Sequence, residues 1–121
     1  EALRELQQHA ETLVPLKQAA ERAPEDSRIW LAIGWCQKRI GRVDLAVDAL
    51  QRALAVAPGE ALLHYNLACY MALLGEKTRV LDHLSKALAI DPNYRDLVDE
   101  EPDFDPIRSD PDFRALTTMI A

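Results

Sequence analysis

The sequence predicts an all-α fold, in which antiparallel helix pairs stack into a short right-handed α-solenoid of about six to seven helices. Three observations predict it. Landmark residues recur with a period of 34 residues, apolar residues within each period recur at helical spacing, and glycine or proline stands where each helix should end. The length of 121 residues is enough for one compact domain, so we expect a single domain.

The repeat is clearest between residues 41–58 and 75–92, which match almost position for position. A helix over 27–40 is expected to begin at Asp26 or Ser27 and to end at Gly41, because glycine tolerates the left-handed conformation found after helices. A second helix over about 44–56 should stop at Pro58. Residues 27–60 therefore form one predicted repeat and residues 61–94 another, with helices over 60–74 and about 78–90.

Residues 1–26 are predicted to be a partial or atypical first repeat, because Ala19 and Pro24 precede Ala53 and Pro58 by one period. A helical stripe of apolar residues supports this: Leu3, Leu6, Ala10 and Leu13. Pro15 suits the first turn of a helix better than its interior. Two alternatives stay open, a break near residues 9–12 with Thr12 as cap or one kinked helix.

Residues 95–121 depart from the repeat and are predicted to be acidic capping helices. Each Asp-Pro pair is expected to place a cap before a proline at the first helical position. The last helix, expected over 111–120, would carry Phe113, Leu116 and Ile120 on one face. A cap is needed because a terminal repeat otherwise exposes its apolar face.

Charge is distributed unevenly. Residues 91–121 carry 9 acidic and 3 basic side chains and account for the whole net charge of −6. This balance argues against a general nucleic-acid binder.

No apolar run reaches the roughly 18 residues of a membrane-spanning helix. The two cysteines fit a reducing compartment, so a cytoplasmic location is expected. The chain starts with Glu1, which suggests a fragment or a mature form.

The repeat resembles the tetratricopeptide repeat (TPR) family, and the C-terminal unit resembles the end caps of bacterial TPR arrays. In the repeat predicted over residues 27–60, the resemblance rests on Trp30, Ile33, Gly34, Ala46, Leu50, Ala53 and Pro58. Those of the next repeat are Leu67, Ala68, Gly75, Leu84, Ala87 and Pro92. Three positions depart from the family pattern: Gln37 replaces Tyr, His64 replaces Trp and Val80 replaces a small Ala.

The resemblance implies that a partner lies along the concave face, which the first helix of each repeat lines. Carried over by repeat position, the expected partner-binding residues are Arg28, Leu31, Trp35, Lys38 and Arg39, followed by Leu62, Tyr65, Asn66, Cys69 and Leu73. An aromatic side chain together with Arg and Asn is a common hot-spot combination. The alternative is that Trp35 and Tyr65 pack on each other, on the N-terminal helix or on the C-terminal cap.

The resemblance also permits a test for one subclass, which grips the C-terminal carboxylates of chaperones with Lys and Asn side chains. Asn66 matches one position of that clamp. Asp96 and Glu100 stand where basic residues would be needed and would repel a carboxylate. We therefore reject chaperone-tail binding and expect a mixed apolar and acidic peptide or helix.

Catalytic and metal-binding motifs are missing from the sequence, so we expect no catalytic residues, no metal and no cofactor. His9, His64 and His83 follow no known ligand spacing, and a structural role is expected for His64. Cys36 and Cys69 are interpreted as small buried residues, with a disulfide or metal pair as the alternative. The acidic stretch 96–112 is interpreted as solvated caps and turns, with a docking surface for a basic partner as the alternative.

The predicted function is therefore a non-catalytic protein–protein interaction module, an adaptor that binds a peptide or helix of an unidentified partner protein, with no nucleic acid and no membrane insertion involved. The resemblance suggests that it belongs to a longer bacterial protein. A second hypothesis is a self-associating scaffold, a homo-oligomer built through the groove or the open repeat end. An enzyme is the third. The repeat alone cannot identify the partner, because one fold serves many functions.

Overall fold

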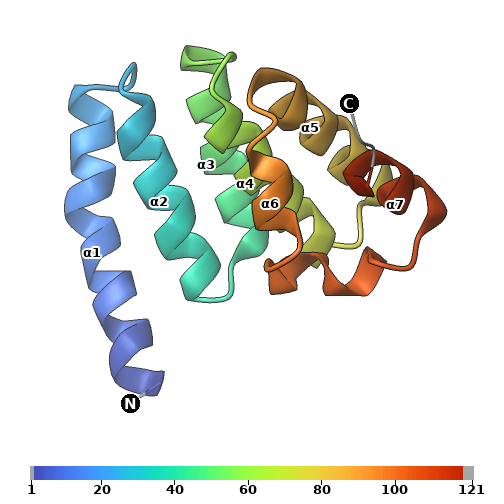
Figure 1. Ribbon diagram of the computed structural model, residues 1–121. Coiled ribbons are helices and arrows are strands. Elements are labelled where there is room, and N and C mark those ends of the chain that lie inside the picture. The colour runs from blue at the N-terminus through green and yellow to red at the C-terminus, as the bar shows by residue number, and fades with distance from the viewer. Residues whose placement is uncertain (1, 119–121) are drawn as a thin grey trace. The chain divides into compact units, whose positions relative to one another are not determined.

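The computed structural model describes residues 2–118 and is all-α: no strand occurs in this range. In chain order its elements are α1 (Ala2–Arg22), α2 (Ser27–Arg39), α3 (Val43–Val56), α4 (Ala61–Leu73), α5 (Lys77–Ile90), α6 (Tyr94–Val98), the 3₁₀ helix η1 (Pro102–Ile107) and α7 (Pro111–Thr118) (Figure 1). The all-α prediction is confirmed. The chain groups into two compact units, residues 1–58 and 59–121.

The helix boundaries follow the signals in the sequence. The Asp26 carboxylate caps α2 by accepting a hydrogen bond from the Arg28 backbone N–H at 3.0 Å. Gly41 and Gly75, the glycines after the first helix of each repeat, have φ angles of +88° and +75°. This left-handed conformation is strained for other residues and explains both glycines.

Residues 2–22 form one continuous helix, α1, with Pro15 inside it. The alternative with a break near residues 9–12 is thus wrong. The Thr12 hydroxyl does not cap a new helix. It donates a hydrogen bond back to the Gln8 carbonyl at 2.8 Å. Packing of Leu13 and Ala20 of α1 against α2 offsets the lost backbone hydrogen bond at Pro15.

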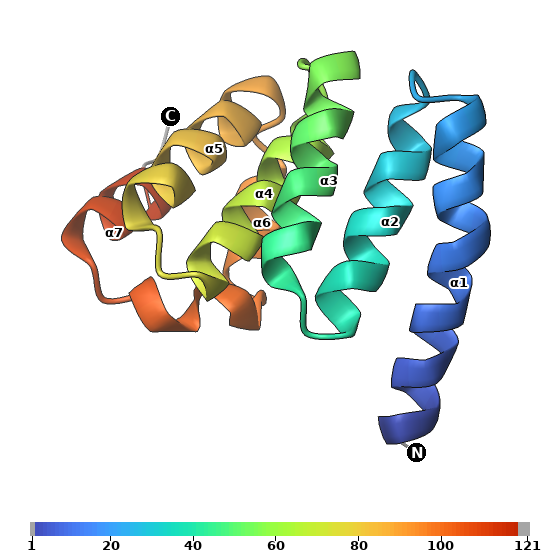
Figure 2. The same ribbon diagram turned by 180° about the vertical axis from the view of Figure 1, so that it is seen from behind.

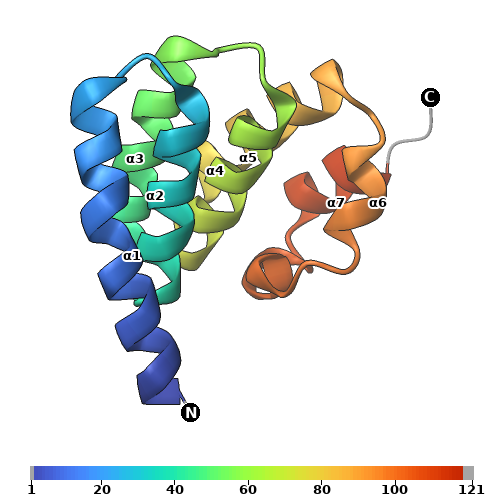
Figure 3. The same cartoon turned by 90° about the vertical axis from the view of Figure 1, so that its left-hand side faces the viewer.

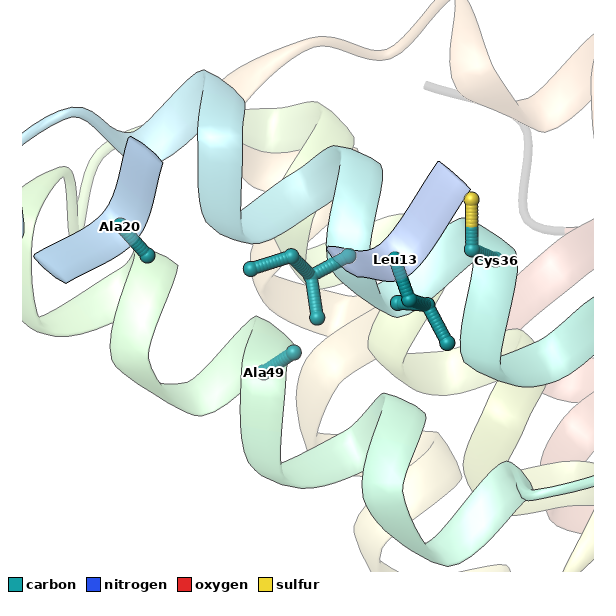
Figure 4. Packing of buried hydrophobic residues seen from close by; sticks show 5 residues of the cluster. Leu13, Ala20, Cys36 and Ala49 are labelled. Atoms are coloured by element: carbon teal, nitrogen blue, oxygen red, sulfur yellow. The ribbon is translucent and has the colours of Figure 1, made fainter. Parts of the chain in front are cut away.

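Unit 1, residues 1–58, packs α1, α2 and α3 side by side (Figures 1 and 2). Its core joins all three helices through Leu13 and Ala20 of α1, Ile33 and Cys36 of α2, and Ala49 of α3. Figure 4 shows the side chains of this cluster, with Leu13, Ala20, Cys36 and Ala49 labelled. The helical stripe of apolar residues expected on α1 is only partly buried. Leu13 at one end is buried, while Leu3 at the other is 81% exposed.

Gly34 marks a close approach of α2 to α3. A Cβ at this position would lie 2.5 Å from Cδ2 of Leu50 and 3.3 Å from the carbonyl oxygen of Ala46. Leu50 and Ala46 are completely buried, so neither can move away easily. The glycine is therefore required by helix packing, and its backbone conformation is an ordinary helical one.

We expect Gly34→Ala to lower the free energy of unfolding of unit 1 by about 1–3 kcal/mol, because it overpacks this contact. The better helix propensity of alanine offsets part of this cost. Gly59→Ala is the matched control, since no atom lies within 4 Å of the added Cβ. Denaturant unfolding followed by tryptophan fluorescence measures both variants, and an unchanged midpoint for Gly34→Ala would contradict this contact.

Unit 2, residues 59–121, consists of the α4–α5 pair and the C-terminal segment that packs on it. η1 contacts α4, while α6 and α7 contact α5. Figure 3 shows the C-terminal segment on one side of the α4–α5 pair. Phe104 of η1 is completely buried and Phe113 of α7 is 2% exposed. The C-terminal segment thus supplies part of the core of this unit.

The Asp-Pro predictions have different outcomes. Pro111 begins α7, and the Asp110 carboxylate accepts from the Phe113 backbone N–H at 3.0 Å, as expected. The expectation for Asp105 and Pro106 is wrong, because Pro106 lies inside η1. The Asp105 carboxylate instead pairs with Arg108 at 2.7 Å. In the last helix, Leu116 is half-buried, while Ile120 lies outside the described residues.

Candidate partner-binding surfaces

Trp35 is the centre of the candidate surface on unit 1. Its side chain is 50% exposed, although the indole is a large apolar group. The His9 ring of α1 meets it edge-to-face, with 4.9 Å between ring centroids, and the Arg39 guanidinium lies 5.6 Å from its centroid. These contacts hold the indole in place while leaving half of it in solvent.

A cavity of about 610 Å³ lies beside Trp35, between α1 and α2. The residues that line it come from both helices: Gln8, His9, Glu11, Thr12, Pro15, Trp35 and Cys36. The Cys36 thiol is buried, and burial raises its pKa, so it stays protonated near neutral pH. The cavity therefore offers an aromatic wall and polar rim groups but no thiolate nucleophile.

The basic residues predicted beside Trp35 belong to different local arrangements. Arg28 is exposed and forms an ion pair with Asp26 at 3.1 Å, which lowers the pKa of that carboxyl. Arg39 lies 3.8 Å from Glu5, and both side chains are largely exposed. Lys38 and Leu31 are half-buried. Exposed ion pairs of this kind contribute little stability, so a partner's carboxylate can replace Glu5 at little cost.

The five predicted residues of α4 separate into two groups. Leu62 and Leu73 are exposed and Asn66 is half-buried. Tyr65 and Cys69 are buried, with only 5% and 3% of their surfaces exposed. In this structure a partner could contact the first three residues, but it could not reach Tyr65 or Cys69 while the C-terminal segment is in place.

The reason for the burial of Tyr65 is an aromatic chain within unit 2. The Tyr65 ring lies 5.1 Å from Tyr94 and 5.9 Å from Phe104, and Phe104 lies 5.4 Å from Phe113, measured between centroids. Of the alternatives left open by the sequence, Tyr65 therefore packs on the C-terminal cap and Trp35 on the N-terminal helix. Such long-range pairings carry no local sequence signal.

His64 and His83 form a second pairing that sequence spacing did not reveal. Their Nδ1 atoms lie 3.2 Å apart, and the rings are stacked with 5.5 Å between centroids. A hydrogen bond at this distance requires one ring to donate and the other to accept, so at least the accepting ring is neutral. Burial, and next the charge of His64, lower the pKa of His83. His64 is 7% exposed, so its ring packs inside unit 2.

The depressed pKa of His83 predicts that unit 2 loses stability as the pH falls. Above the unfolded-state pKa, near 6.5, both states are neutral at this residue. Between the unfolded-state pKa and the lower folded-state pKa, His83 binds a proton only in the unfolded chain, which favours unfolding. We expect the melting temperature to fall between about pH 7.5 and pH 5.5, a range above the titration of the carboxylates.

His83→Gln tests this interpretation, because glutamine does not titrate. Its melting temperature should change less over the same pH range than that of the unchanged protein. Gln8→Ala is the control. Gln8 is exposed and does not titrate, so this variant should keep the full pH dependence of the melting temperature. If His83→Gln keeps the full pH dependence, the pair does not cause it.

Neither Cys36 nor Cys69 forms a disulfide, so the disulfide alternative is wrong. No helix among residues 2–118 is long and apolar enough to cross a membrane. The acidic residues Asp96 and Glu100 are exposed on unit 2.

Comparison with known proteins supports the repeat. A family model described as tetratricopeptide repeat matches residues 3–68, which include α1, α2, α3 and the first half of α4. No curated protein matches the sequence. The family is typically non-catalytic, and its members generally serve as protein–protein interaction modules. The match covers more than half of the chain and agrees with the helix pairs and the positions of Gly34, Gly41 and Pro58, so this protein belongs to the tetratricopeptide repeat family.

Proposed function

We propose that this protein is a non-catalytic adaptor that binds a peptide or helix of a partner protein on the Trp35 surface of unit 1. The observation that carries the proposal is the half-exposed indole beside a cavity of about 610 Å³. A large aromatic ring that is fixed by neighbours loses little conformational entropy on binding, and Trp and Arg are the residues most enriched in hot spots.

The chemistry of the surface indicates the kind of ligand. The cavity beside Trp35 suits an apolar side chain, and Arg39 and Lys38 in the last turn of α2 suit an acidic one. Because the Arg39–Glu5 pair is long and exposed, exchanging Glu5 for a ligand carboxylate costs little. The proposed ligand is therefore a segment with an apolar anchor followed or preceded by Asp or Glu.

An affinity pull-down from a lysate of the source organism, with quantitative mass spectrometry, tests the proposal. Trp35→Ala should lose the captured partner, since truncation of a hot spot costs about 2 kcal/mol or more, roughly a 30-fold loss of affinity. Val56→Ala, which shortens another exposed apolar side chain of unit 1, should retain it. Retention by both variants would refute the Trp35 surface.

The resemblance to the family also implies a contribution from α4. Capture of the partner by Leu62→Ala and Leu73→Ala tests whether α4 contributes to binding, because both side chains are exposed. If both variants retain a partner that Trp35→Ala loses, the ligand is confined to unit 1. Weaker capture by either variant would extend the surface to α4.

Self-association is the second candidate, and exposed apolar residues of α1 favour it. Leu3 is 81% exposed, Val14 is 58% exposed and Leu6 is 39% exposed. Burial of these side chains against a second copy would remove apolar surface from water. Light scattering over increasing protein concentration tests it: a dimer that Leu3→Glu abolishes supports it, and a strict monomer rules it out.

A further inference from the structure

Three side chains with metal-binding atoms meet in unit 2. Cys69 lies on α4, Glu101 directly precedes η1, and Asp103 lies in η1. One ligand atom from each, the thiol sulfur and a carboxylate oxygen from each acid, lies within 4.8 Å of the other two. Cys69 is buried and the two acids are half-buried, so the cluster lies at the inner edge of the contact between α4 and η1.

A fourth polar group points to a ligand at this cluster. Tyr65 precedes Cys69 by one turn of α4, is 5% exposed, and its buried hydroxyl has no hydrogen-bond partner. A buried hydroxyl without a partner is costly, and few such groups occur in folded proteins. The Tyr65 side chain also lines one cavity together with Glu101, the first acid of the cluster.

We propose that Cys69, Glu101 and Asp103 bind one divalent cation of the zinc type, with the Tyr65 hydroxyl donating a hydrogen bond to a water on the ion. One sulfur and two carboxylate oxygens suit Zn²⁺, which accepts S and O ligands in tetrahedral geometry. From the Zn–S and Zn–O bond lengths, such ligand atoms lie roughly 3.4–3.7 Å apart. Small side-chain rotations would bring the three atoms to that spacing.

Glu101 keeps one carboxylate oxygen for an ion. One Glu101 carboxylate oxygen accepts from the Asp103 backbone N–H at 3.2 Å, so the second oxygen can serve as ligand. The Arg108 guanidinium bonds to the Asp105 carboxylate and to the main-chain carbonyl of Glu101. A cavity of about 250 Å³, lined by Tyr65, Leu97, Glu100 and Glu101, adjoins the cluster and provides space for entry.

Binding would have two consequences. The Cys69 thiol would release its proton to solvent as the sulfur becomes a thiolate ligand, so affinity should rise with pH. The ion would also join α4 to the segment that contains η1. A cation that binds only the folded state stabilises it, and the stabilisation increases with concentration relative to Kd.

Titration of the intact chain with Co²⁺ tests the site, because a cysteine ligand produces a thiolate-to-cobalt absorption band in the near ultraviolet. We expect such a band, its loss when Zn²⁺ is added, and slower amide hydrogen exchange in residues 94–113 of the zinc-loaded protein. Cys69→Ser should remove the band. Cys36→Ser, at the other buried cysteine, should retain it.

Glu101→Gln and Asp103→Asn provide a second readout in case Cys69→Ser is poorly folded. Each removes one charged ligand and should weaken Co²⁺ binding by about 10-fold to 100-fold or more, since even outer-shell losses have effects of this size. Absence of the band from the unchanged protein would overturn the proposal. So would a band that Cys36→Ser removes or that the two acid variants leave unchanged.

Discussion

Ala53→Asp is expected to unfold unit 1. Ala53 lies in the last turns of α3 and has no exposed surface. An aspartate there would bury a carboxylate in a space that holds one methyl group. Burying an unpaired charge costs several kcal/mol, comparable to the 5–15 kcal/mol by which whole domains are stable.

The distribution of aromatic residues lets this effect be assigned to one unit. Both tryptophans lie in residues 1–58 and all three tyrosines lie in residues 59–121. Tryptophan fluorescence therefore follows unit 1, and thermal unfolding followed by this signal should show no native baseline in Ala53→Asp. The tyrosine resonances in an NMR spectrum report unit 2 in the same sample.

Ala55→Asp is the matched control, because Ala55 is exposed two residues further along the same helix. Both variants place a negative charge near the C-terminus of α3, where the helix dipole disfavours it by a few tenths to about 1 kcal/mol. Only Ala53→Asp adds the cost of burial. A melting temperature equal to that of the unchanged protein would mean that the 34-residue register assigned to α3 is wrong.

The repeat was predictable from sequence because its determinants are local. Gly41 ends α2 through its own φ angle, and Asp26 caps that helix two residues from the N–H it binds. Apolar periodicity likewise depends on neighbours along one helix. The boundaries of α2, α3, α4 and α5 accordingly lie within one residue of those expected from the sequence.

The candidate sites were less predictable because they depend on contacts between distant residues. Trp35 could be placed on the surface of α2, but its contact with His9 depends on α1 continuing through Pro15. Tyr65 was assigned to a binding surface by its repeat position. It is buried because Phe104, 39 positions later, packs against it. Side-chain pairing at such separations is decided by tertiary packing, which no local pattern encodes.

Truncation of Phe104 is expected to have the largest effect in unit 2. Phe104 has no exposed surface, and its ring contacts those of Tyr65 and Phe113. Phe104→Ala removes both aromatic contacts and leaves a cavity, which typically costs about 3–5 kcal/mol. Because η1 contacts α4 through this region, the loss should release the C-terminal segment before the α4–α5 pair unfolds.

Peptide-resolved hydrogen exchange distinguishes release of the segment from general unfolding. In Phe104→Ala, amides of residues 94–118 should exchange faster, while those of α2 and α3 in unit 1 should keep their protection. Leu97→Ala is the control, since Leu97 lies in α6 of the same segment but is 49% exposed. Release would uncover Tyr65, a residue that the repeat position assigns to partner binding. If protection in residues 94–118 survives in Phe104→Ala, Phe104 does not hold the cap on α4, and the burial of Tyr65 has another cause.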